Sequence, residues 1–128
     1  MISFEQFALE EGSPIYVQII RHIKRGIVAG TIADGDEMPS RRVLSALLGV
    51  NPNTVQKAYR MLEDEGIIAS HAGAKSYVVA DEARAAQIRV QLLENDSRAI
   101  VGALKQMGLD KEDALALIDR LWEETEVL

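Results

Sequence analysis

The chain has 128 residues, of which 48% are hydrophobic and none is cysteine. A packed core is therefore within reach, and disulfides and thiolate metal sites are excluded. The net charge of −6 is uneven: residues 1–80 hold 8 basic and 9 acidic side chains, and residues 81–128 hold 6 and 11. The first part can approach a polyanion, whereas the second should stay away from it. We expect neither a secretory leader nor a membrane span, and hence a cytoplasmic protein.

The first helix is predicted to start after a connector at residues 8–13. Ser13 and Pro14 are typical of an N-cap and a first helical residue, and Gly30 is typical of a helix end. Between them, isoleucines recur at helical spacing and form one apolar stripe. These isoleucines are Ile15, Ile19, Ile20, Ile23 and Ile27. A turn follows at Asp34-Gly35-Asp36.

Two further helices are predicted close together. Ser40 caps the first of them, and Gly49 allows the chain to turn sharply after it. Asn51 then serves as N-cap and Pro52 as first residue of the next helix, which runs to about Glu65. The expected buried side of the short helix comprises Val43, Leu44, Leu47 and Leu48.

The helix after Asn51 has one packing face and one polar face. At about 100° per residue, its apolar residues share a narrow arc and its polar residues occupy the opposite arc. The apolar arc comprises Val55, Ala58, Tyr59 and Leu62, and the polar arc Asn53, Gln56, Lys57 and Arg60. No acidic residue stands between Met38 and Leu62, so the field there is locally basic. This is the layout of a helix-turn-helix, whose second helix enters the major groove of DNA.

The rest of the chain predicts a hairpin followed by helices. Residues 67–70 and 76–79 are typical of two short strands, which form a wing when they follow a helix-turn-helix. Residues 81–107 are helical in pattern, as one helix or as two joined at a kink, and Asp110 caps a last helix. Two helices cannot hide such apolar stripes alone, so we expect a homodimer. The candidate dimerisation residues are Ile100, Leu104, Leu115, Ile118, Leu121 and Trp122.

These elements resemble the GntR-type winged-helix transcription regulators, strongly over residues 13–80. The residues that match are Met38-Pro39-Ser40, Gly49-Val50, Asn53-Thr54-Val55, Leu62-Glu63 and Glu65-Gly66-Ile67-Ile68. The segments Pro14–Ile19 and Asn51–Tyr59 look most like the YtrA subfamily, in which a small helical dimerisation region stands where other branches carry a large effector domain. Lys75 departs from the family by standing where the wing usually has its second glycine.

The resemblance implies a set of DNA-binding residues at the start of the two short helices and in the wing. Arg42 matches the family's phosphate-binding arginine, whereas Asn51 is more typical of a cap than of a base reader. The base-reading residues are left open among the first turns of the third helix. The full set is Ser40, Arg41, Arg42, Asn51, Asn53, Thr54, Gln56, Lys57, Arg60, Gly73 and Lys75.

The sequence thus predicts a mainly α protein with a small β-wing. A winged helix-turn-helix DNA-binding domain would occupy residues 1–80, and a helical dimerisation region residues 81–128. The predicted function is a transcription regulator, most simply a repressor that binds an inverted-repeat operator in double-stranded DNA as a homodimer. The alternative is a winged-helix module that binds proteins. We expect no enzyme, cofactor or metal site, because nucleophile–base sets and ligand spacings are missing. The operator and any small-molecule effector remain open.

Overall fold

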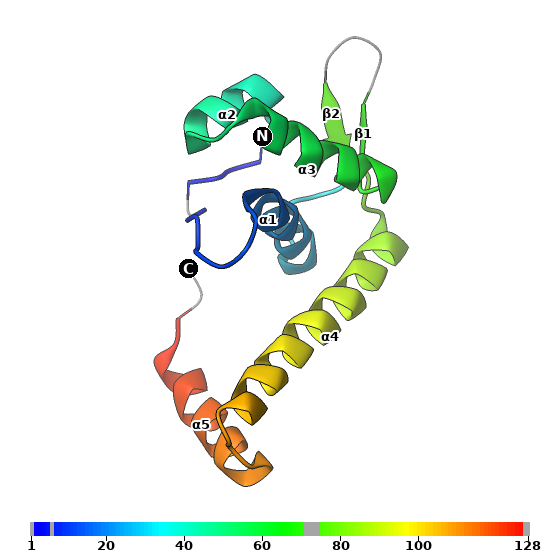
Figure 1. The fold of residues 1–128 in the computed structure, drawn as a ribbon. Coiled ribbons are helices and arrows are strands. Elements are labelled where there is room, and N and C mark those ends of the chain that lie inside the picture. The colour runs from blue at the N-terminus through cyan, green and yellow to red at the C-terminus, as the bar shows by residue number, and fades with distance from the viewer. Residues whose placement is uncertain (1, 6, 71–74, 127–128) are drawn as a thin grey trace. The chain divides into compact units, whose positions relative to one another are not determined.

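The structure is a computed structural model that describes residues 2–5, 7–70 and 75–126 (Figure 1). The chain divides into two compact units, Met1–Val90 and Gln91–Leu128. The first unit extends past the predicted boundary at residue 80, because Ile88 is buried in its hydrophobic core. The first turns of the helix that starts at Glu82 therefore pack with the first unit.

Helix α1 spans Ile15–Ala29 and lies across the middle of the first unit in Figure 1. It starts one residue later than predicted, because Pro14 has extended backbone and is itself the N-cap, without a side-chain cap from Ser13. Gly30 ends the helix with a left-handed φ of 83°, as the sequence predicted. The buried residues of α1 are Ile19, Ile20, Ile23, Gly26 and Ile27.

Helix α2 spans Arg41–Leu48 and has both predicted caps. The hydroxyl of Ser40 accepts a hydrogen bond from the backbone N–H of Val43 at 3.1 Å. Gly49 follows with a φ of 66°, a left-handed conformation that L-residues rarely adopt. The turn between the two helices is thus set by local residues.

The buried side of α2 differs from the prediction. Val43 and Leu47 were expected in the core, but their side chains are 55% and 64% exposed. Leu44 is fully buried as predicted, and Leu48 is half-buried against the core. The inward position that was not predicted is Ser45, whose Oγ donates a hydrogen bond to the carbonyl of Val50 at 2.6 Å. Because this serine satisfies a backbone group of the turn, the inward arc of the helix is rotated toward it and away from Val43 and Leu47.

Helix α3 spans Pro52–Asp64 and packs against α1 and α2. Its N-cap is Asn51, whose Oδ1 accepts from the backbone N–H of Asn53 at 2.8 Å. Tyr59 is fully buried, and its hydroxyl donates a hydrogen bond to the carbonyl of Pro39 at 2.6 Å. The predicted packing face is confirmed, and its buried residues are Val55, Ala58, Tyr59 and Leu62.

The wing is an antiparallel hairpin of β1, Ile68–Ser70, and β2, Ser76–Val78. Both strands lie within the predicted ranges, and the register pairs Ile68 with Val78, Ala69 with Tyr77, and Ser70 with Ser76.

Two irregular segments that precede the hairpin in the sequence also pack in the first unit, and neither was predicted. Met38 donates its backbone N–H to the carbonyl of Ser76 at 2.8 Å, so the chain before α2 runs along β2. The N-terminal segment buries Ile2 and Phe4 in the core of the first unit. These segments are too short to show a periodic apolar pattern. Their partners also lie far away in the sequence, so the sequence alone does not predict where they pack.

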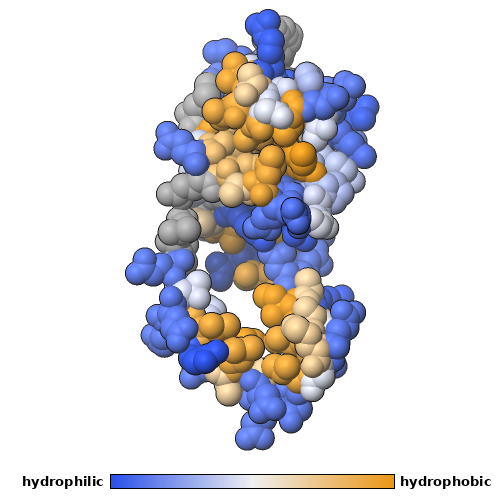
Figure 2. All heavy atoms as spheres, turned by 60° about the vertical axis from the view of Figure 1, so that its left-hand side comes forward, coloured by the Kyte–Doolittle hydropathy of each residue, from blue (hydrophilic) through white to orange (hydrophobic). Residues whose placement is uncertain are grey.

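The second unit contains most of α4, Glu82–Gln106, and all of α5, Lys111–Glu124. Helix α4 is continuous, which settles whether residues 81–107 form one helix or two. Asp110 caps α5 by accepting from the backbone N–H of Asp113 at 2.9 Å. No described residue from 91 to 126 is buried, and Figure 2 shows apolar side chains exposed on this unit. Within the described chain, none of the helices is long and apolar enough to cross a membrane.

Candidate nucleic-acid interface

The outward face of α3 presents the polar residues that the sequence singled out. Asn53, Gln56, Lys57 and Arg60 are all exposed, while Thr54 is half-buried at the edge of the packed face. Because the opposite face is anchored in the core by residues without measurable exposure, this polar row is held in a fixed direction. A rigid helix that projects amide and basic side chains can contact base edges and phosphates.

Two of the predicted DNA-binding residues are helix N-caps. The side-chain oxygens of Ser40 and Asn51 cap α2 and α3, each accepting a backbone N–H. Both residues are exposed, so the first turns of both helices face solvent. The positive ends of the two helix dipoles are therefore open to an approaching phosphate.

The neighbouring arginines Arg41 and Arg42 have different surroundings. The guanidinium of Arg41 is half-buried, forms an ion pair with Glu63 at 3.0 Å, and lies 4.9 Å from the centroid of the Tyr59 ring. Arg42 is exposed, and it makes no hydrogen bond or ion pair to any described residue. The structure thus engages Arg41 within the fold and leaves Arg42 available at the start of α2.

Lys57 is exposed, and its side chain contacts an aromatic ring of α1. Its Nζ lies 4.1 Å from the centroid of the Tyr16 ring on α1, a cation–π contact. Such contacts at exposed sites contribute about 0.5–1 kcal/mol. A base contact by Lys57 would have to give up this stabilisation, whereas Gln56 has no described partner to lose.

The wing lysine is paired with a carboxylate from outside the hairpin. Lys75 Nζ lies 3.0 Å from Glu37 Oε1, and this hydrogen bond raises the pKa of Lys75 above its ordinary value. Glu37 is placed there by its bridge to Tyr77 on β2. The other predicted wing residue, Gly73, lies outside the described residues.

Sequence reasoning missed the role of Glu63. Its Oε1 accepts hydrogen bonds from Arg41 Nη2 at 3.0 Å and from Ser70 Oγ at 2.8 Å. One carboxylate near the end of α3 thereby connects the start of α2 with strand β1. The only sequence signal was the residue itself, because the partners are 22 and 7 positions away.

The predicted dimerisation residues remain at the surface of this single chain. Five of the six predicted dimerisation residues are exposed, with Trp122 at 77%, and the sixth, Leu104, is half-buried. The exposed set is Ile100, Leu115, Ile118, Leu121 and Trp122.

Comparison with known proteins identifies this arrangement. The family model described as bacterial regulatory proteins of the gntR family matches residues 15–78, which include α1–α3 and the hairpin. The chain is 36% identical to the HTH-type transcriptional repressor YtrA of Bacillus subtilis over 111 residues, covering 87% of this chain and 81% of that protein. It is 29% identical to the uncharacterized HTH-type transcriptional regulator YhcF of the same organism, covering 83% and 88%.

Solved structures agree. A GntR family transcriptional regulator from Listeria monocytogenes superposes with a TM-score of 0.75 at 32% identity, covering 88% of this chain and 98% of that one. YtrA from Sulfolobus acidocaldarius, a GntR-family transcription factor, gives a TM-score of 0.55 at 37% identity, covering 74% and 99%. These relatives are regulators rather than enzymes, and the winged helix is the fold that they share. The chain is therefore a DNA-binding transcription regulator that belongs to the GntR family.

Proposed function

We propose that the protein is a repressor that binds an inverted-repeat operator as a two-fold homodimer in the cytoplasm. The observation that carries this proposal is the polar face of α3. The side chains of Asn53, Gln56 and Arg60 are exposed, and none makes a hydrogen bond or ion pair to another described residue. Amide and guanidinium groups without internal partners on a rigidly anchored helix are suited to reading base edges.

Each group in this surface has a distinct task in the proposal. Arg42 and the capped starts of α2 and α3 hold phosphates and fix the position of the protein on the duplex. Gln56 and Asn53 read bases, since an amide can form paired hydrogen bonds with adenine in the major groove. Arg60, one turn further along α3, reaches a base or the backbone of the opposite strand.

Dimerisation is supported by what the second unit leaves uncovered. Its described residues include no buried side chain, although large apolar residues occur along both of its helices. Exposed apolar surface of this extent marks an interaction site in soluble proteins. A second copy of the chain is the simplest partner, because a two-fold interface lets one apolar face cover its equivalent.

The relative YtrA supports the proposal that this protein represses transcription. YtrA of Bacillus subtilis is called a repressor, and it matches this chain along most of both sequences. A winged helix with a short helical region can repress by occupying a promoter, because bound protein excludes other proteins from the same DNA. A dimer also gives the affinity and specificity that one small module lacks.

The decisive experiment selects genomic DNA fragments with the purified protein and then footprints the enriched site. We expect two inverted half-sites with centres about 10 base pairs, or a multiple of that, apart. Sedimentation at micromolar concentration should give twice the monomer mass. A single asymmetric half-site, or a monomer that binds with full affinity, would contradict the dimer proposal. Equal affinity for selected and random DNA would contradict sequence-specific binding.

A further inference from the structure

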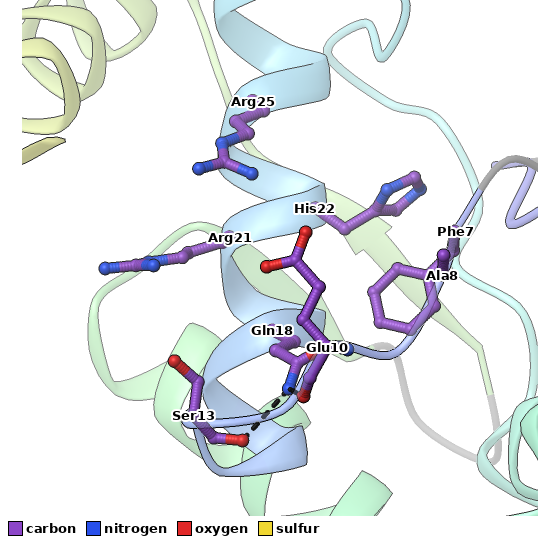
Figure 3. Close-up of a pocket in the computed structure, with 8 residues that line it drawn as sticks. All are labelled: Phe7, Ala8, Glu10, Ser13, Gln18, Arg21, His22 and Arg25. Carbon is purple, nitrogen blue, oxygen red and sulfur yellow. Dashed lines mark hydrogen bonds between the residues drawn. The ribbon is translucent and has the colours of Figure 1, made fainter. Parts of the chain in front are cut away.

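A cavity of about 210 Å³ opens on the first unit, and none of the predicted DNA-binding residues lines it (Figure 3). Its walls come from the segment that precedes α1 and from one side of α1 itself. The lining residues are Phe7, Ala8, Glu10, Ser13, Gln18, Arg21, His22 and Arg25. This volume has room for several water molecules, or for one molecule about the size of an amino acid.

The cavity is held open by hydrogen bonds within the protein. Gln18 Nε2 donates to the carbonyls of Glu10 and Ser13 at 2.8 and 2.9 Å, and Gln18 Oε1 accepts from the backbone N–H of Glu10 at 2.8 Å. Both polar atoms of the Gln18 side chain are thereby hydrogen-bonded, and they tie the segment before α1 to the helix. A wall fixed in this way lowers the entropy cost of binding a ligand.

One wall of the cavity is aromatic. The His22 ring lies 4.4 Å from the ring of Phe4 and 5.3 Å from that of Phe7, measured between centroids. His22 Nε2 lies 2.8 Å from the carbonyl of Ser3, which requires a proton on Nε2. The ring is therefore fixed in orientation, and together with Phe7 and Ala8 it offers a surface for an apolar group.

Opposite charges line the remaining walls. Arg21 and Arg25 are one helical turn apart on α1, where a guanidinium can bind a carboxylate through paired hydrogen bonds. Glu10 lines the same cavity from the preceding segment. No ion pair joins Glu10 to Arg21, and Arg21 makes no hydrogen bond or ion pair to any described residue. A cationic and an anionic group thus border one small cavity without neutralising each other.

We propose that this cavity binds a free amino acid with an apolar side chain. The carboxylate of the ligand would pair with Arg21, its ammonium with Glu10, and its side chain would pack on Phe7 and Ala8. A zwitterion is the class that uses both charges. Glu10 disfavours inorganic phosphate and nucleotides, because a second negative charge would face its carboxylate.

The site is tested on the full chain without DNA, so that the result is independent of operator binding. L-Phenylalanine and L-leucine serve as probes in an NMR titration, with 3-phenylpropionate, phenethylamine and inorganic phosphate for comparison. We expect saturable binding of at least one amino acid, with shifts confined to residues around the cavity. The compounds that lack the ammonium or the carboxylate should bind at least tenfold more weakly, since each loses one charged hydrogen-bonding partner.

Matched variants locate the binding. Arg21→Gln should weaken amino-acid binding about tenfold or more, whereas Arg89→Gln, an exposed arginine on α4, should leave it unchanged. Glu10→Gln should weaken the amino acid but not 3-phenylpropionate. Thermal unfolding of all three variants should match the parent, since these side chains are not buried. The proposal is overturned if neither amino acid shows saturable binding, or if phosphate binds as tightly as the amino acid. It is also overturned if the Arg21→Gln variant binds the amino acid as tightly as the parent.

Discussion

Arg41 and Glu63 join the first turn of α2 to the last turn of α3, with Nη2 3.0 Å from Oε1. The same carboxylate oxygen accepts the hydroxyl of Ser70 on β1. One acidic side chain on α3 therefore contacts both α2 and β1. The ion pair also removes Arg41 from the set of freely available cations and leaves Arg42 beside it at the surface.

This difference between neighbours gives the first prediction. Arg42→Ala should weaken binding to operator and random DNA alike and lower the salt slope by about 1, because one phosphate contact is lost. Arg41→Ala is the matched control. It should instead lower the free energy of unfolding by about 1 kcal/mol, the value of a half-buried ion pair with a cation–π contact. DNA affinity at several salt concentrations and chemical denaturation distinguish them. An unchanged slope for Arg42→Ala would place it outside the interface.

The second prediction concerns base reading by α3. Gln56→Ala should cost about 1–3 kcal/mol on the operator and much less on random DNA, since an amide–base pair is lost. Its stability should barely change, because Gln56 is exposed. Val55→Asp, one position away, should prevent folding by burying an unpaired charge. If specific and random affinities fall in proportion for Gln56→Ala, that residue contacts only the DNA backbone.

The third prediction follows from the pair at the wing. Glu37 holds Lys75 at 3.0 Å and raises the pKa of this lysine. Glu37→Gln should release the lysine and remove a negative charge, so that affinity for random DNA rises and the salt slope steepens by about 1. Lys75→Gln should change the slope in the opposite direction if the lysine reaches phosphate. Equal slopes for the parent and both variants would show that the pair lies away from DNA.

The fourth prediction concerns the buried phenol of Tyr59. Burial raises the pKa of Tyr59 far above its ordinary value, so the folded state keeps a proton that the unfolded state releases above pH about 10. The stability contributed by this proton is present at neutral pH and is lost as pH rises. By pH 11 the loss should reach about 1.4 kcal/mol.

Tyr59→Phe should remove that alkaline loss. At neutral pH it should cost about 1–3 kcal/mol, because the carbonyl of Pro39 loses its donor in a buried setting. Tyr16→Phe is the control, since Tyr16 is half-buried and no internal hydrogen bond of its hydroxyl is seen among the described residues. Chemical denaturation at pH 7 and pH 11 measures the free energy of unfolding of each protein. If Tyr59→Phe and the parent lose the same free energy between the two pH values, the prediction is wrong.

The fifth prediction tests the apolar surface of α5. Leu121→Glu should shift the sedimentation equilibrium toward monomer, because a charge enters the proposed two-fold interface. Arg120→Glu, next to it and exposed, should leave the dimer in place if it lies outside the apolar face. The winged-helix unit should stay folded in both, since no described residue beyond 90 is buried. A Leu121→Glu protein that remains dimeric would place the interface elsewhere.

The local signals in the sequence were sufficient for the helices and for the turn between them. Caps, prolines and glycines act on the backbone within a few residues. Ser40 and Gly49 therefore predicted where α2 begins and ends, and Asn51 and Pro52 predicted where α3 begins. The strict 3.6-residue period of α3 likewise predicted which face packs and which stays polar. The family followed from the order of these same residues.

Other features depended on side-chain contacts that the sequence pattern does not reveal. The period of α2 is too short to define its buried arc, and only the hydrogen bond from Ser45 to Val50 shows why Val43 and Leu47 face outward. The division of labour between Arg41 and Arg42 depends on Glu63, which is 22 residues from Arg41.

The sequence by itself thus determined the element order, the packing and polar faces of α3 and the family, because each is encoded in short-range backbone preferences and apolar periodicity. Only the tertiary structure decided which cations are engaged, that Tyr16 supports Lys57, and that Gln18 holds a cavity open beside α1. Those features arise from side chains that meet across the fold, and a one-dimensional pattern contains no record of which distant residues meet.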